Sequence, residues 1–141
     1  MSIVIRHPTP AEFPAVYEAS TTAFLARPDI QRVAAQFGAV MDPDRMWVAW
    51  DGERACGTFR SWPTELTLPG CRSLPAAAVS GVTVLPTHRR RGILTDMTAA
   101  AHAAIAEAGE PLAVLIASEY PIYGRFGYGP ATRDARITVD T

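Results

Sequence analysis

The chain has 141 residues, of which 48% are hydrophobic, and this is enough to bury one core of single-domain size. Its 13 basic side chains are all arginines and stand against 14 acidic ones, so the formal net charge of −1 excludes a broad positive field for nucleic acid or an anionic membrane. Because the sequence has neither a run of about 20 apolar residues nor a basic-then-apolar leader before Ile3, we expect a cytoplasmic protein without a membrane partner.

Hydrophobic spacing predicts both strands and helices in the first half of the chain. The elements are a strand, two helices and two further strands, in this order at residues 2–6, 11–20, 29–37, 46–50 and 55–62. Asp51-Gly52 lies between the last two strands and favours a tight hairpin turn, because this dipeptide accepts positive φ angles. Residues 66–74, which include Pro69-Gly70, indicate a loop or a short edge connection.

The second half of the chain predicts a strand, a long helix and a second strand. Residues 76–85 read as the first strand, and apolar side chains at every fourth position predict a helix over residues 92–108. Residues 112–117 are continuously apolar, which is typical of a strand covered on both faces, so we expect this strand in the middle of a sheet. Two shorter elements, a helical segment and an alternating strand, are predicted at residues 120–125 and 135–139.

The most informative stretch is V-S-G-V-T-V-L-P-T-H-R-R-R-G-I-L-T, residues 79–95, which runs from a strand through a turn into a helix. The first turn of a helix exposes unpaired backbone N–H groups and the positive end of the helix dipole, so it can bind a phosphate. Arg89, Arg90 and Arg91 add positive charge, and Gly92 allows the backbone to approach a bulky diphosphate. The motifs G-x-x-x-x-G-K-[ST] and G-x-G-x-x-G are both missing. The segment therefore predicts a phosphate site of another kind, with a solvated basic turn as the alternative.

Two blocks of this sequence resemble a known family. Arg89 to Gly92 fit the first four positions of [QR]-x-x-G-x-[GA], the coenzyme A signature of the GNAT superfamily, although Leu94 stands where a small residue is usual. The second block, S-E-Y-P-I-Y-G-R-F-G-Y-G-P-A-T at residues 118–132, is similar to the Y-x-x-F-G-[FY] ending of these domains. Together the blocks resemble the enhanced intracellular survival (Eis) acetyltransferases of actinobacteria, in which leucine at the position of Leu94 is ordinary.

The resemblance implies an α/β fold of the GNAT type, with a mixed, mostly antiparallel twisted sheet and helices on both faces. The sheet would be open between the strands that end near Leu85 and Ala117. The implied activity is transfer of acetyl from acetyl-CoA to a primary amine of an aminoglycoside or of a lysine in a protein or peptide. Residues 1–141 would be a single GNAT domain, either the N-terminal part of a longer chain that forms a homo-oligomer or a single-domain relative without the later regions.

The resemblance also implies which residues form the site. The pantetheine arm of the coenzyme would lie beside the backbone of one strand, at Val82, Thr83 and Val84. The diphosphate would be held by the turn and helix start at Arg90, Arg91, Gly92, Ile93, Leu94 and Thr95. The opposite wall would contain Ser118 and Glu119, and Tyr123 corresponds to the tyrosine that protonates the departing coenzyme A thiolate.

The remaining candidate side chains are interpreted as structural. Tyr120 and Tyr128 are expected to pack, and His102 is expected to support its helix. His88 is expected at the surface, because it lies in a turn beside three arginines. Cys56 and Cys71 lack the short spacing of metal ligands, so we expect reduced thiols and no metal site.

Two other functions stay open from the sequence. The chain could hold acyl-CoA without catalysis, or the arginine turn could contact nucleic acid. In Eis-like enzymes a second acetyltransferase-like region and a sterol-carrier-like region follow, and their C-terminal carboxylate acts as the base. We therefore expect residues 1–141 to bind acetyl-CoA but to transfer acetyl slowly, since an amine that stays protonated at neutral pH cannot attack a thioester.

Overall fold

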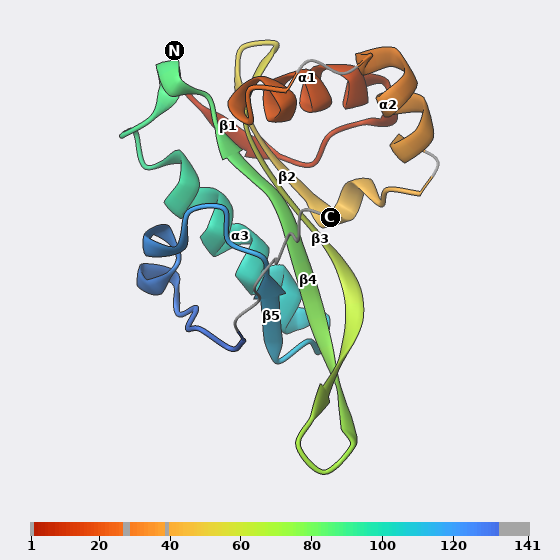
Figure 1. Ribbon diagram of the computed structural model, residues 1–141. Helices are drawn as coiled ribbons and strands as arrows, with labels where there is room; N and C mark the ends of the chain where they lie inside the picture. Colours follow the sequence, from red (N-terminus) through yellow and green to blue (C-terminus); the bar gives the residue numbers. More distant parts are fainter. Residues whose placement is uncertain (1, 27–28, 39, 133–141) are drawn as a thin grey trace, which may run out of the picture.

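The computed structural model describes residues 2–26, 29–38 and 40–132, and these form one mixed sheet with helices on both faces (Figure 1). The strands lie across the sheet in chain order, as β1 (Val4–Arg6), β2 (Met46–Asp51), β3 (Arg54–Leu68), β4 (Arg72–Val84) and β5 (Leu112–Leu115). Pairing is antiparallel from β1 to β4, whereas β5 pairs parallel to β4. This is the mixed, mostly antiparallel arrangement that the family resemblance implies.

The helices cover both faces of the sheet, as predicted. Figure 1 shows α1 (Phe13–Ala23) and α2 (Ile30–Gly38) on one face and α3 (Ile93–Glu107) on the other. Among the described residues, no helix combines the length and the apolar character needed to cross a membrane.

The interior strand β2 contributes to the core on each face. Because successive side chains of a strand point to opposite faces, Met46, Val48 and Trp50 pack with α1, while Trp47 and Ala49 pack with α3. All five side chains are buried. A strand buried on both faces carries no polar alternation, which explains the continuous M-W-V-A-W sequence.

An ion pair holds the start of α1 against the first strand. Arg6 at the end of β1 donates to both carboxylate oxygens of Glu12, at 2.6 and 2.9 Å. The same carboxylate accepts the backbone N–H of Thr9 at 2.8 Å. Mainly because of the hydrogen bonds from Arg6, and then because of that from Thr9, the pKa of Glu12 is lowered to about 2.

The β3–β4 hairpin is longer than the sequence predicts. Residues 66–74 were expected to form a loop, but β3 continues to Leu68 and β4 begins at Arg72. The chain reverses at Gly70 and Cys71, which adopt φ angles of 85° and 58°. Leu66 pairs with Leu74 across the two strands, so cross-strand contacts extend the ladder to the turn itself.

Strand β5 lies elsewhere in the sheet than predicted. Within the part of the chain that the structure describes, it is an edge strand with β4 as its neighbour. Ala113 and Leu115 pack against the core below α3, whereas Leu112 is 39% exposed and Ile116, just after the strand, is 99% exposed. The apolar residues 112–117 therefore belong to a strand that is covered on one face of the sheet, and not to a central strand covered on both faces. The strand predicted at residues 135–139 lies outside the described residues.

Candidate active site

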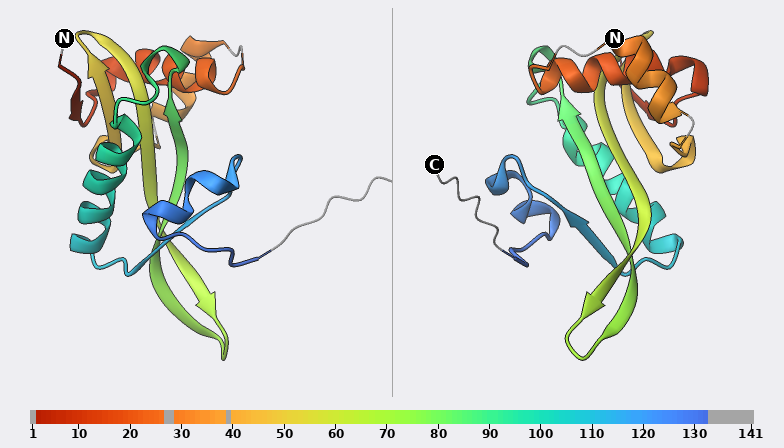
Figure 2. Two further views of the ribbon diagram at one scale, coloured as in Figure 1. Left: turned by 90° about the vertical axis from the view of Figure 1, so that its left-hand side faces the viewer. Right: turned by 45° about the vertical axis from the view of Figure 1, so that its right-hand side comes forward.

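The site begins where β4 and β5 separate. Their parallel pairing runs from Ala76 opposite Leu112 to Val79 opposite Leu115, and the two strands then diverge (Figure 2). The open sheet that the sequence predicts between these strands is thus present.

A β-bulge in β4 lies just beyond the last paired residue. The register between β3 and β4 shifts between Thr58 and Arg60, opposite Gly81, whose φ is 59°. A bulge bends its strand and increases the local twist, which turns β4 away from β5. The carbonyl oxygen of Gly81 accepts a hydrogen bond from the Thr58 hydroxyl at 2.6 Å. A glycine inside a strand pattern was the available sequence signal for this bulge.

The diverging strands enclose a cleft of about 690 Å³, a volume within the usual range of small-molecule sites. The predicted residues that line it are Val82, Thr83, Val84, Arg90, Gly92, Ile93, Leu94, Thr95, Ser118, Glu119 and Tyr123. Arg91 is exposed and is not among the lining residues, because the backbone turns at Arg90, whose φ is 63°. Sequence reasoning missed further lining residues, among them Phe24, Gly81, His88, Ile116 and Arg125.

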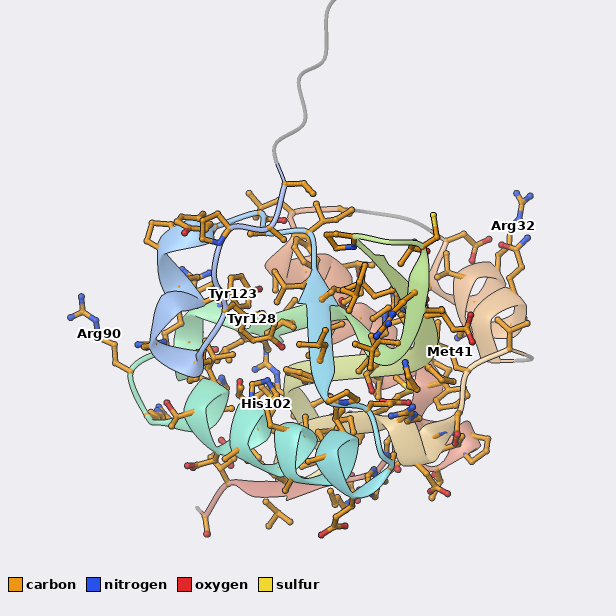
Figure 3. The ribbon with its side chains drawn as sticks, turned by 90° about the horizontal axis from the view of Figure 1, so that it is seen from below. Arg32, Met41, Arg90, His102, Tyr123 and Tyr128 are labelled. Carbon is orange, nitrogen blue, oxygen red and sulfur yellow. The ribbon has the colours of Figure 1, made fainter. Side chains whose placement is uncertain are left out.

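One end of the cleft is formed by the start of α3. Gly92 is the N-cap of this helix with a φ of 78°, and no side chain caps the first turn. The backbone N–H groups of that turn therefore have no intrahelical acceptor and can bind an anion. Arg90 projects away from the body of the protein beside this helix end (Figure 3). The free N–H groups can bind a phosphate group, while the outward direction of Arg90 is also what a solvated basic turn would show.

The segment between β4 and α3 is fastened to the β2–β3 hairpin by His88. This histidine is only 6% exposed, contrary to the surface position that the sequence predicts. Its Nε2 lies 3.2 Å from Asp51 Oδ2, and its Nδ1 lies 2.8 Å from Thr87 Oγ1. Folding of the segment onto the end of β2 buries the ring, which no local sequence pattern could indicate.

Tyr123 lies on the opposite side of the cleft, between two short 3-10 helices, η4 (Tyr120–Ile122) and η5 (Gly124–Phe126). Its side chain is half-buried, and burial raises the pKa of its hydroxyl. The phenol is therefore protonated at neutral pH and could donate a proton. Figure 3 shows that Tyr123 lies beside Tyr128 and above His102 of α3.

The charges around the cleft are mainly positive. Three arginines line it, Arg89, Arg90 and Arg125, whereas Glu119 is the one carboxylate among the described lining residues. Within the described residues, no group of three or more His, Cys, Asp or Glu side chains could hold a metal ion. Arg89 and Arg90 give one end of the cleft a positive charge that suits a polyanion. The backbone of β4 along the cleft suits an extended ligand with amide groups.

Comparisons with known proteins agree with this geometry. The family model described as "Acetyltransferase (GNAT) domain" matches residues 4–131. An uncharacterized N-acetyltransferase of Streptomyces avermitilis is 49% identical over 123 residues, which cover 86% of this chain and 29% of the relative. N-acetyltransferase Eis of Mycobacterium tuberculosis is 40% identical over 146 residues, covering 99% of this chain and 36% of Eis.

A solved structure shows the same relationship. Eis1 from Mycobacterium abscessus superimposes with a TM-score of 0.80 at 36% identity, over 93% of this chain and 32% of Eis1. The chain thus belongs to the GNAT acetyltransferase family and is related to the Eis proteins within it. It spans about a third of the length of the curated relatives that it matches.

Proposed function

We propose that the protein of which this chain is the GNAT domain transfers acetyl from acetyl-CoA to a primary amine of an aminoglycoside or of a lysine-type acceptor. The observation that carries this proposal is the cleft between β4 and β5, with an uncapped helix start and arginines at one end and a half-buried phenol at the side. Family membership supports the same reaction.

The coenzyme fits the cleft by its chemistry. Its diphosphate would bind the free N–H groups at the start of α3, where Gly92 leaves space and Arg90 supplies charge. The backbone of β4 from Val82 to Val84 would pair with the amide groups of the pantetheine arm, because the pairing of β4 with β5 ends at Val79. Ser118 and Glu119 would close the opposite wall.

The acetyl transfer can then be written with Tyr123 of this chain as the proton donor. The amine nitrogen attacks the thioester carbon, a C–N bond forms, and the C–S bond breaks. Tyr123 gives its phenolic proton to the departing thiolate and is reprotonated from solvent. The attacking amine must lose a proton to a base. We expect this base to come from outside residues 1–141, because Glu119 is exposed and belongs to the coenzyme wall.

Binding and turnover test the two main readings. We expect calorimetry to show acetyl-CoA binding by residues 1–141. We expect the natural full-length protein that contains these residues, here called the full chain, to release thiol from acetyl-CoA only when a primary amine is added. Binding without amine-dependent thiol release in the full chain would instead support an acyl-CoA-binding module. Absence of acetyl-CoA binding would contradict both readings.

Tyr123→Phe tests the general acid. The substitution keeps the ring and removes the proton donor, so we expect kcat to fall by about 10² to 10⁴ while the acetyl-CoA affinity stays nearly unchanged. Tyr120→Phe is the matched control, because Tyr120 lies three residues away and is 58% exposed. Equal kcat values for Tyr123→Phe and the wild-type chain would contradict the role.

A further inference from the structure

A row of aromatic side chains connects the hydrophobic core to Tyr123. Phe59 of β3 is 2% exposed, and its ring meets the ring of His102 edge-on, with centroids 6.5 Å apart and planes at 81°. His102 lies next to Tyr128 (5.5 Å, 51°), and Tyr128 meets Tyr123 edge-on (5.8 Å, 73°). Three of these residues are seen together in Figure 3, between α3 and the segment after β5.

One polar contact fixes the middle of this row. Nε2 of His102 lies 3.0 Å from the hydroxyl oxygen of Tyr128, within hydrogen-bond distance. Burial lowers the pKa of His102, so the imidazole is neutral at neutral pH. Burial, and then the neighbouring Tyr123, raise the pKa of Tyr128 to about 12. Both partners are therefore uncharged at neutral pH, where the Tyr128 hydroxyl can donate to Nε2 of His102.

The backbone holds the two tyrosines together as well. Gly127 has a φ of 90°, and this left-handed residue turns the chain so that Tyr128 returns toward Tyr123. The backbone N–H groups of Phe126 and Tyr128 both donate to the carbonyl oxygen of Tyr123, at 2.9 and 3.3 Å. These bonds keep the main chains of Tyr123 and Tyr128 close together, while the Tyr128 ring also contacts His102 of α3.

We propose that His102 and Tyr128 are positioning residues for Tyr123, which they hold in the orientation that presents its hydroxyl to the cleft. The role rests on the proposed function, in which Tyr123 protonates the coenzyme A thiolate. Tyr123 is on a segment of short 3-10 turns, and such a segment positions a side chain less rigidly than a long helix or a paired strand does. His102 comes from the middle of α3 and supplies the missing rigidity through Tyr128.

Kinetics of the full chain test this proposal. Tyr128→Phe keeps the ring contact but removes the hydroxyl that His102 binds, and we expect kcat to fall on the order of 10- to 100-fold with an unchanged KM for acetyl-CoA. His102→Phe should cause a similar loss. His102→Gln should recover part of the rate, because its side-chain amide can still reach the Tyr128 hydroxyl. Tyr120→Phe again serves as the control.

Combination with Tyr123→Phe separates positioning from a general loss of stability. If Tyr128 acts only through the Tyr123 hydroxyl, Tyr128→Phe should cost nothing further once that hydroxyl is gone. The same fold-loss in both backgrounds, or a wild-type kcat for Tyr128→Phe, would overturn the proposal.

A readout without turnover keeps this test independent of the proposed function. If the full chain releases no thiol with any amine, the proposed function fails, and the positioning role is judged from NMR spectra of the chain with ring-labelled tyrosine. We expect Tyr128→Phe and His102→Phe to shift or broaden the ring signals of Tyr123, and Tyr120→Phe to leave them in place. Unchanged Tyr123 signals in the first two variants would overturn the inference.

Discussion

The hydroxyl of Thr58 donates to the carbonyl oxygen of Gly81 at 2.6 Å, at the bulge where β4 turns away from β5. Thr58 is 4% exposed, and its oxygen also lies 2.7 Å from Oγ1 of Thr83. A bulge leaves ladder groups without a partner, and this side chain satisfies one of them inside the protein. The shape of the cleft therefore depends on one buried threonine on the neighbouring strand.

Thr58→Val should destabilise the fold and weaken acetyl-CoA binding. Valine has the same shape, but it leaves the partly buried Gly81 carbonyl without this donor, which costs up to about 1–3 kcal/mol. Urea denaturation and calorimetry measure the two effects. Thr67→Val, at the exposed end of the same strand, should stay within about 0.5 kcal/mol of wild type. Equal stability of the two variants would contradict this account of the bulge.

Gly92→Asp should weaken acetyl-CoA binding more than Arg90→Ala does. A Cβ at Gly92 would meet Asp96 Oδ2 at 3.8 Å, so there is space for a side chain, but the φ of 78° strains any residue other than glycine and the carboxylate would also repel the phosphate. Gly92→Asn is the matched control, since asparagine tolerates positive φ and lacks the charge. We expect calorimetry to show at least a tenfold difference in Kd between the Asp and Asn variants, about 1.4 kcal/mol. Equal Kd values would place the diphosphate elsewhere.

Arg90→Ala should have a smaller effect, because an exposed arginine contributes about 0.2–1 kcal/mol to an ion pair. The loss of affinity should shrink as salt is added, since salt screens exposed charges. A salt-independent loss would point to altered backbone geometry at Arg90, whose φ is positive, instead of a lost charge.

The contact between His88 and Asp51 should couple the β4–α3 segment to the hairpin. A double-mutant cycle of Asp51→Ala and His88→Ala should give a coupling free energy of about 0.5–3 kcal/mol in the stability of the chain. Both single variants should also weaken acetyl-CoA binding, because His88 lines the cleft. Glu53→Ala controls for changes in the hairpin turn. Strictly additive effects of the two single substitutions would show that the contact contributes no coupling free energy.

Glu12 should make the chain more sensitive to acid. Its folded pKa of about 2 lies below the ordinary value of 4.5, so its contribution to stability is complete above about pH 4.5 and is lost as the pH falls toward 2. Glu12→Gln should reduce that acid-dependent loss by no more than about 1 kcal/mol, since the pair with Arg6 is near the surface. Denaturation of both proteins at pH 7 and pH 3 measures the difference, with Glu18→Gln as the control. An identical pH dependence of Glu12→Gln and wild type would contradict the assignment.

The elements that the sequence predicts correctly are those with local signals. Asp51-Gly52 marks the β2–β3 turn, and Gly52 has a φ of 62° there. The strand, turn and helix around Gly92 are also predicted from neighbouring residues. Gly92 and its neighbours form one end of the cleft. Their capacity to bind an anion could be predicted because every helix start has free N–H groups.

The features that the sequence does not reveal depend on contacts between distant residues. The buried His88 lies within hydrogen-bond distance of Asp51, 37 positions earlier in the chain. His102 lies within hydrogen-bond distance of Tyr128, 26 positions later. Neither pair has a periodicity or a motif that would bring it together. The edge position of β5 within the described residues likewise depends on the arrangement of the sheet, because an apolar run shows that a strand is covered but not how many strands flank it.

The parallel pairing of β4 with β5 has a consequence for the order of folding. Strands β2, β3 and β4 follow one another through short turns, so this meander can form from segments that are neighbours along the chain. Strand β5 can reach β4 only after the chain has passed through the whole of α3, which requires closure of a much longer loop. The cleft between β4 and β5, which needs both strands, therefore belongs to the part of the domain whose formation requires the longer loop closure. A ligand that bridges β4 and the segment after β5 would stabilise this late-forming half of the molecule selectively.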